Sequence, residues 1–156
     1  LLSVRCPEPD SVGRRILTPA REAIAYHEAG HAVISMKLGY SCLYVTTIPD
    51  GDRLGHVCCE DPMAGGHDDK IKHALKVLIA TSLADDHVKA MNLALLATDH
   101  DTEQAEALIN EVIGEARKLV EQHWPDIEKL AVQIIVEGRV NFLQPKATDS
   151  EGSDSR

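Results

Sequence analysis

Two histidines and a glutamate form an H-E-x-x-H pattern at His27, Glu28 and His31. On a helix, residues four apart lie on one face, so two imidazoles at this spacing can bind the same Zn²⁺ ion. The glutamate between them lies close enough to a water molecule at the metal to accept its proton. These groups are typical of enzymes that hydrolyse peptide bonds. They predict His27 and His31 as zinc ligands and Glu28 as the general base.

The residues around the pattern predict a helix over 19–37. Thr18 can cap its start, and Gly39 stands where a helix ends in a left-handed residue. Small and apolar residues recur on the helical face that carries both histidines: Ala20, Ala23, Ile24 and Ile34. Because the pattern lies in a predicted helix, a metal site explains it better than a chance occurrence of two histidines and a glutamate.

The composition fits one globular domain and excludes several classes of partner. The chain has 156 residues, 44% hydrophobic and only 3% aromatic, with a net charge of −9. Such a charge argues against nucleic acid and anionic membrane surfaces as partners. No apolar run reaches the ~18–20 residues of a membrane span, and no signal peptide is visible. We expect a cytoplasmic protein, and the first residue, which is not Met, indicates a processed chain or part of a longer one.

The pattern along the chain predicts a mainly α (α+β) fold. Two β-prone runs, 41–48 and 54–59, flank a Pro-Asp-Gly turn and predict a hairpin or small sheet after the H-E-x-x-H helix. Further helices are expected over 68–92, 101–124 and 125–137, with a break at 93–100. Residues 1–17 read as an irregular lead-in, and 145–156 as a disordered acidic tail.

The cysteines predict neither a disulfide nor a metal site. They are Cys6, Cys42, Cys58 and Cys59, and none forms a C-x-x-C pair. Cys58 and Cys59 are adjacent and should face opposite sides of a strand. We interpret them as small, buried or half-buried thiols of a reducing compartment.

A catalytic zinc ion needs a third protein ligand, which the residues alone leave open. The extended H-E-x-x-H-x-x-G-x-x-H pattern is absent, because Ile34 and Lys37 occupy its glycine and last histidine positions. The remaining candidates lie further along the chain: Asp85, Asp86, His87, Asp99, His100 and Asp101, with His56 and His67 as weaker ones.

Several segments resemble the peptidase domain of the FtsH family, the M41 metallopeptidases. Residues 25–33 read A-Y-H-E-A-G-H-A-V, and V-T-T-I-P at 45–49 followed by L-G at 54–55 is similar to a second family element. Residues 79–86 stand where the family has L-G-G-R-A-A-E-E. The similarity extends over roughly residues 19–143. It implies a helical, zincin-like peptidase domain over 18–144.

The same resemblance implies a complete ligand set. His100 and Asp101 fall where the family has Asn-Asp, whose aspartate is the third zinc ligand. Asp101 thereby joins His27 and His31 as a ligand, and Asp99 is the first alternative. A second interpretation of Asp101 is a helix cap, since Gln104 follows at capping-box spacing.

The chain departs from the family between residues 80 and 86. Ala80, Thr81 and Ser82 replace the paired glycines and the arginine, and Asp85 and Asp86 replace paired glutamates. If these carboxylates support the site from outside the ligand shell, their reach is shorter. The family also joins this domain to a hexameric ATPase and membrane spans, which this sequence lacks. The resemblance therefore implies homo-oligomers and an ATPase partner in another chain or segment.

The leading hypothesis is a zinc endopeptidase that acts on unfolded or extended polypeptides. The run 54–59 could offer a strand edge to such a substrate. One alternative is a catalytically weak or inactive binding or regulatory module derived from a peptidase. Another is a zinc hydrolase with a small or non-peptide substrate. The intact Glu28 favours a hydrolase over a purely structural site.

Overall fold

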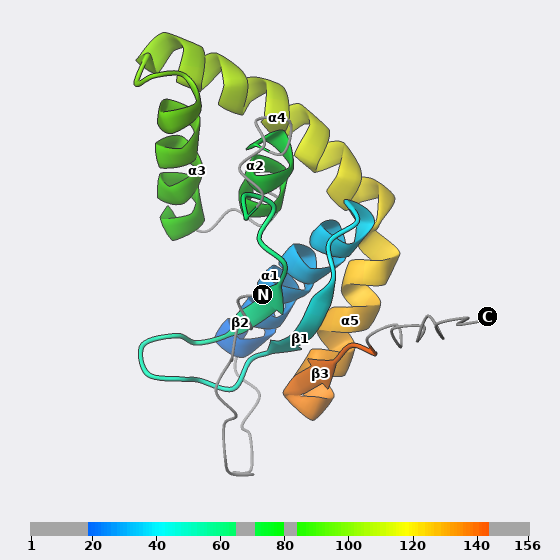
Figure 1. Cartoon of the computed structure of the whole chain (residues 1–156). Helices are drawn as coiled ribbons and strands as arrows, with labels where there is room; N and C mark the ends of the chain where they lie inside the picture. Colours follow the sequence, from blue (N-terminus) through cyan, green and yellow to red (C-terminus); the bar gives the residue numbers. More distant parts are fainter. Residues whose placement is uncertain (1–18, 65–70, 80–83, 144–156) are drawn as a thin grey trace, which may run out of the picture.

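The computed structural model describes residues 19–64, 71–79 and 84–143. Its described residues form five helices and three strands (Figure 1): α1 Pro19–Lys37, β1 Cys42–Thr46, β2 His56–Cys59, α2 Ile71–Ile79, α3 Ala84–Ala97, α4 Thr102–Gln122, α5 Trp124–Glu137 and β3 Arg139–Asn141. The fold is thus mainly α with a small antiparallel sheet, the predicted class. None of the described helices is both long and apolar enough to cross a membrane. The expected lead-in 1–17 and tail 145–156 lie outside the described residues.

Helix α1 has the predicted bounds and ends as its sequence indicates. Gly39 has a φ of +93°, and the N–H of Tyr40 donates to the carbonyl of Ser35 at 3.0 Å. This left-handed ending satisfies a carbonyl of the last turn. The buried face differs in part from the expected one, since Ile34 is fully buried but Ala20 and Ala23 are exposed. The residues of α1 in the main core are instead Ala25, Ala29, Ala32 and Val33. The proposed cap Thr18 lies outside the described residues.

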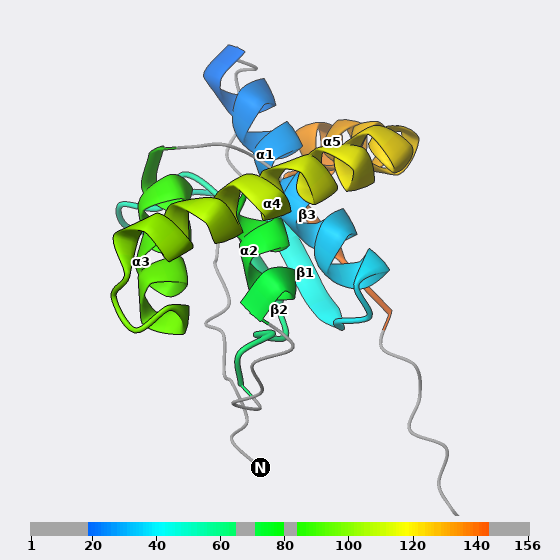
Figure 2. The ribbon, with the colours of Figure 1, turned by 90° about the horizontal axis from the view of Figure 1, so that it is seen from above.

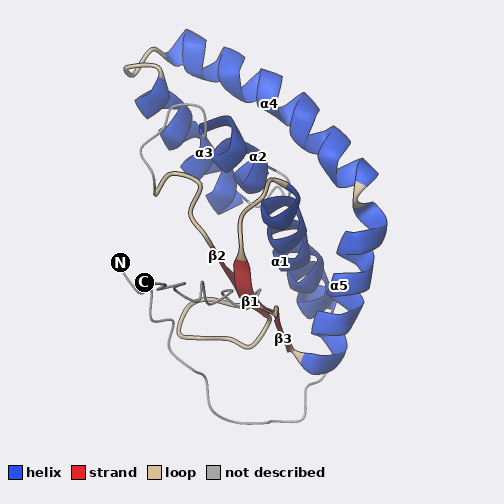
Figure 3. Ribbon diagram, turned by 45° about the vertical axis from the view of Figure 1, so that its right-hand side comes forward, coloured by secondary structure: helices blue, strands red, loops and turns tan. Residues whose placement is uncertain are grey.

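The sheet has the strand order β2-β1-β3, and both pairs are antiparallel. Val45 of the central strand pairs with Val57 on one side and Val140 on the other. The hairpin of β1 and β2 was predicted, but the three-residue strand β3 was not. Helices α1 and α5 lie on one face of the sheet (Figure 3). This arrangement leaves β2 at an edge, beside α1.

Two cysteines are joined where free thiols were expected. Cys42 and Cys59 are direct partners across β1 and β2 and form a disulfide. The interpretation of these two residues as thiols was therefore wrong. Seventeen residues separate them in sequence, and only the strand register brings them together. Cys58 is a half-buried thiol.

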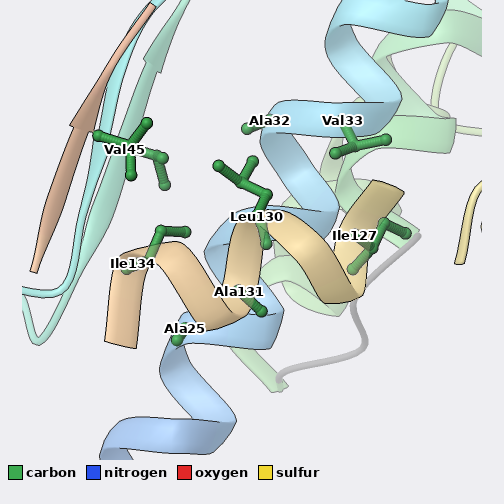
Figure 4. Packing of buried hydrophobic residues seen from close by; sticks show 10 residues of the cluster. Ala25, Ala32, Val33, Val45, Ile127, Leu130, Ala131 and Ile134 are labelled. Carbon is green, nitrogen blue, oxygen red and sulfur yellow. The ribbon is translucent and has the colours of Figure 1, made fainter. Parts of the chain in front are cut away.

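The main core lies between α1, α5 and the sheet. Figure 4 shows Ile127, Leu130 and Ile134 of α5 facing α1 and Val45 of the central strand. At one end of the α1–α5 contact, the ring of Tyr26 stacks on Trp124 with centroids 5.7 Å apart. The small alanines of α1 let the two helices approach closely, which suits a chain with few aromatic residues.

A second core joins α2, α3 and α4. Leu75 of α2, Ala90 and Ala94 of α3, and Ile109 and Val112 of α4 are all buried in it. Figure 2 shows α4 running along the other two helices. The two cores share no residue, so α1 and α3 belong to different packing units.

The predictions for residues 68–100 were only partly correct. One helix was expected over 68–92, but α2 ends at Ile79 and α3 begins at Ala84. Helix α3 also continues through the expected break to Ala97. The chain then turns at Asp99 and His100, which both have positive φ. Helices α4 and α5 match the predictions, and Gly138 ends α5 with a φ of 75°.

Candidate metal centre

Helices α1 and α3 bring three potential ligand atoms together. His27 Nε2 lies 3.1 Å from Asp86 Oδ2, and His31 Nε2 lies 3.2 Å from the same oxygen. The two imidazole Nε2 atoms are themselves 3.2 Å apart. The side chains of all three residues are at most 11% exposed. This group, among the described residues, meets the geometric requirement for holding a metal ion, with all ligand atoms within 4.8 Å of one another.

The separations suit a small tetrahedral ion. Zinc bonds of about 2.0–2.1 Å set neighbouring ligand atoms about 3.3 Å apart in a tetrahedron. The three separations in the structure, 3.1 to 3.2 Å, are close to that value. Two imidazole nitrogens and one carboxylate oxygen are also a donor set used by catalytic metal sites that leave a position open. The residues therefore fit a metal ion without rearrangement of the backbone.

A hydrogen bond from α1 to α2 orients one of the imidazoles. His31 Nδ1 donates to the backbone carbonyl of Val77 at 2.8 Å. The contact holds a proton on Nδ1 and turns Nε2 toward His27 and Asp86. Nε2 can donate to Asp86 when it carries a proton, and it offers its lone pair to a metal ion when it does not. Metal-binding histidines in general hold their second nitrogen in this manner. The contact is independent support for a metal-binding role of His31.

The two carboxyl groups of the site have pKa values shifted in opposite directions. Burial raises the pKa of Glu28 to about 7, with the charge of Asp86 adding to the effect. The hydrogen bond to His31 lowers the pKa of Asp86 to about 2, helped by Lys89. Asp86 is therefore ionised at neutral pH and can bind a cation, whereas Glu28 can exchange a proton near pH 7. This division suits one ligand and one acid–base group.

A cavity of about 590 Å³ opens over the group and over Glu28. Its other wall includes Arg53, Leu54 and Gly55, which lead into β2, and Val57 of β2 itself. Gly55 is packed so closely that a Cβ atom there would lie 2.7 Å from Ile24 Cγ2. The strand β2, the candidate base Glu28 and the metal group thus line the same cavity.

The structure does not bring Asp101 to this group. Asp101 is exposed and is the N-cap of α4, where its Oδ1 accepts the Gln104 N–H at 2.9 Å. Asp86 lies in the first turn of α3, and Asp101 follows the last turn. The eleven residue steps from Asp86 to Ala97 along α3 span roughly 17 Å, so one helix holds the two carboxylates apart. Of the two interpretations of Asp101, the structure contains the cap, and Asp86 takes the place expected of the third ligand.

None of the other candidate ligands that the structure describes belongs to the metal group. His87, Asp99 and His100 are exposed. His56 lies in the cavity wall, but its Nε2 is 3.0 Å from the Tyr44 hydroxyl. The Asp85 side chain and His67 lie outside the described residues.

Three features of the site were not recognised from the sequence. These are the Val77 carbonyl, the close packing of Gly55 and the contact of Lys89 with Asp86. No sequence pattern indicates that the Val77 carbonyl accepts a hydrogen bond from His31 or that Gly55 packs against Ile24. The D-x-x-K spacing of Asp86 and Lys89 does indicate their contact, since residues three apart meet on a helix surface.

No model of a known protein family matches the chain, and no curated protein matches it either. The function proposed below therefore depends on the geometry of the site, and the resemblance to FtsH peptidases stays a prediction.

Proposed function

We propose that this protein is a zinc-dependent endopeptidase that cleaves extended or unfolded polypeptides, as the resemblance to the FtsH family implies. The observation that carries the proposal is the convergence of His27, His31 and Asp86 beside the buried Glu28. Two imidazoles and a carboxylate also bind iron(II) in oxygenases. A buried glutamate with a pKa near 7 next to the ligands favours hydrolysis, because hydrolysis requires a base.

The residues of the chain divide the work of peptide hydrolysis as follows. A zinc ion held by His27, His31 and Asp86 would polarise a peptide carbonyl and lower the pKa of a water molecule. Glu28 accepts a proton from the water as the oxygen bonds to the carbonyl carbon. Glu28 then gives this proton to the nitrogen as the carbon–nitrogen bond breaks. Burial, which raises the pKa of Glu28 in the metal-free protein, makes its carboxylate a stronger base.

The edge strand β2 supports an extended polypeptide as the substrate. Among the described residues, β2 pairs with β1 alone, and residues that lead into β2 line the cavity. An added strand would bind through main-chain hydrogen bonds, with little dependence on side chains. This arrangement favours unfolded chains over small molecules.

The test is zinc content and casein hydrolysis for the wild type and Glu28→Gln. We expect the wild type to bind one zinc ion per chain and cleave casein. Glu28→Gln should retain zinc and lose activity by a factor of at least about 100, since a general base contributes 10²–10⁴-fold. Zinc binding without hydrolysis in both proteins would instead favour a binding module.

A second pair of variants tests the strand edge. Val57→Pro removes a main-chain donor from β2, whereas Val57→Thr retains it. We expect only the proline variant to lose casein turnover while keeping its zinc. Full turnover in a folded, zinc-loaded Val57→Pro protein would eliminate β2 as the substrate-binding strand.

A further inference from the structure

Lys89 is the cationic side chain that contacts the metal group. It follows Asp86 by three residues on α3, so both side chains project from one face of the helix. Its Nζ lies 3.2 Å from Asp86 Oδ1, while Oδ2 of the same carboxylate faces His27 and His31. Lys89 also lines the cavity that contains Glu28. The Asp86 carboxylate therefore bridges the Lys89 ammonium group and the two imidazole nitrogens.

The ion pair with Asp86 does not occupy all the hydrogen-bond donors of the Lys89 ammonium group. The Lys89 side chain is 64% exposed, and an ammonium has three hydrogens to donate. Among the described residues, Asp86 is the one that accepts from it. The positive charge also acts on Glu28, whose pKa it lowers against the effect of burial. Lys89 is thus close to the base and retains donors for a molecule in the cavity.

The other potential donors of the cavity wall are less well placed. Arg53 is exposed, and no contact links it to the metal group among the residues that the structure describes. His56 has its Nε2 at the Tyr44 hydroxyl, and its Nδ1 is enclosed where solvent does not reach it. Lys89 alone of these three is held against a predicted ligand.

We propose that Lys89 stabilises the negative charge that develops on the carbonyl oxygen of the scissile peptide; this inference rests on the proposed peptidase function. When the water oxygen bonds to the carbonyl carbon, the carbonyl oxygen changes from a neutral to an anionic acceptor. Hydrogen bonds between charged groups are stronger than those to neutral acceptors, so the contact strengthens mainly in the transition state. Lys89 forms no covalent bond and keeps its proton throughout.

The experiment compares zinc-loaded Lys89→Met and Lys89→Arg with the wild type. Removing one donor of this kind lowers kcat by roughly 100-fold or more, so we expect that loss in Lys89→Met with little change in KM. Lys89→Arg should recover part of kcat because it keeps the charge. Lys72→Met is the matched control, since Lys72 pairs with Glu111 on an exposed surface, and it should retain full turnover.

A binding measurement separates this role from the mere support of Asp86. A peptide with a phosphinate in place of the scissile amide resembles the charged transition state, so its affinity should fall by the same factor as kcat/KM. Calorimetry with the zinc-loaded proteins measures that affinity directly. Unchanged kcat and phosphinate affinity in Lys89→Met would overturn the proposal, and so would loss of zinc together with activity. A wild type that binds zinc but cleaves no peptide ends the proposed function itself, before any Lys89 variant is made.

Discussion

A Cβ atom on Gly55 would lie 3.2 Å from Glu28 Cγ, so the segment entering β2 rests directly on the candidate base. The same atom would be 3.0 Å from the backbone oxygen of Thr46, which cannot turn aside as a side chain can. The backbone at position 55 is thus part of what encloses Glu28 and raises its pKa.

Gly55→Ala should destabilise the protein by about 1–3 kcal/mol, the usual effect of overpacking. It should also lower turnover, since Glu28 or the strand must shift. Urea unfolding measures the first effect and casein hydrolysis the second. The control is Gly114→Ala in the interior of α4, where an added Cβ meets nothing within 4 Å. That change should stabilise the protein by about 0.5–1 kcal/mol. Equal effects of the two alanines would contradict the close packing at Gly55.

Asp86→Asn and Asp101→Asn form a second matched pair. Replacing the Asp86 carboxylate by an amide should weaken zinc binding by at least about 10–100-fold, the loss typical even of residues that only support a ligand. Asn is as good an N-cap as Asp, so Asp101→Asn should keep both the cap of α4 and the zinc. Zinc titration against a competing chelator compares the two. Retention by the first variant and loss by the second would restore Asp101 as the ligand.

Glu28 should make the metal-free protein less stable as the pH rises. Its pKa is about 7 in the folded protein against 4.5 ordinarily, so the folded state holds more protons between these values. The free energy of unfolding should therefore fall across this interval, by up to about 3 kcal/mol. Urea unfolding with a chelator present, at several pH values from about 5 to about 8, measures the slope.

Glu28→Gln is the control for this pH dependence, because glutamine does not ionise. Its stability should lack the Glu28 contribution to the slope and should exceed that of the wild type above pH 7. Adding zinc to the wild type should also flatten the slope, since a nearby dication favours the ionised carboxylate. Identical slopes in the two metal-free proteins would show that Glu28 titrates normally.

The disulfide between Cys42 and Cys59 should contribute to stability through the loop it closes. For a separation of 17 residues, chain entropy predicts about 3 kcal/mol. Dithiothreitol should lower the unfolding midpoint of the wild type and of Cys58→Ser, but not that of Cys42→Ser. If the reductant acts equally on all three proteins, no such bond forms in solution.

The helices with strong local signals were predictable. Gly39 and Gly138 end α1 and α5 in the left-handed conformation that their sequence positions indicate. The interval from 68 to 100 lacks comparable signals, and there the expected helix and break were both misplaced. Strand β3 has only three residues and forms because α5 returns the chain to β1. Nothing local to residues 139–141 shows that return.

Only the part of the site that lies on one helix, α1, was predictable from the sequence. The spacing of His27 and His31 is a property of α1 alone. The position of the third carboxylate depends on how the unit of α2, α3 and α4 lies beside α1, and so on two separate cores. The residues alone left Asp86 among the candidates, and the family resemblance then favoured Asp101. That choice required the end of α3, rather than its beginning, to face the histidines.

The stacking of Tyr26 on Trp124 supplies an optical reporter for this chain. Trp124 is its single tryptophan, and Tyr26 directly precedes the first histidine of the centre. Intrinsic fluorescence excited in the indole band therefore originates at one known joint between α1 and α5. Ion uptake, chelation and loosening of the first helix can all be followed there without attaching a dye.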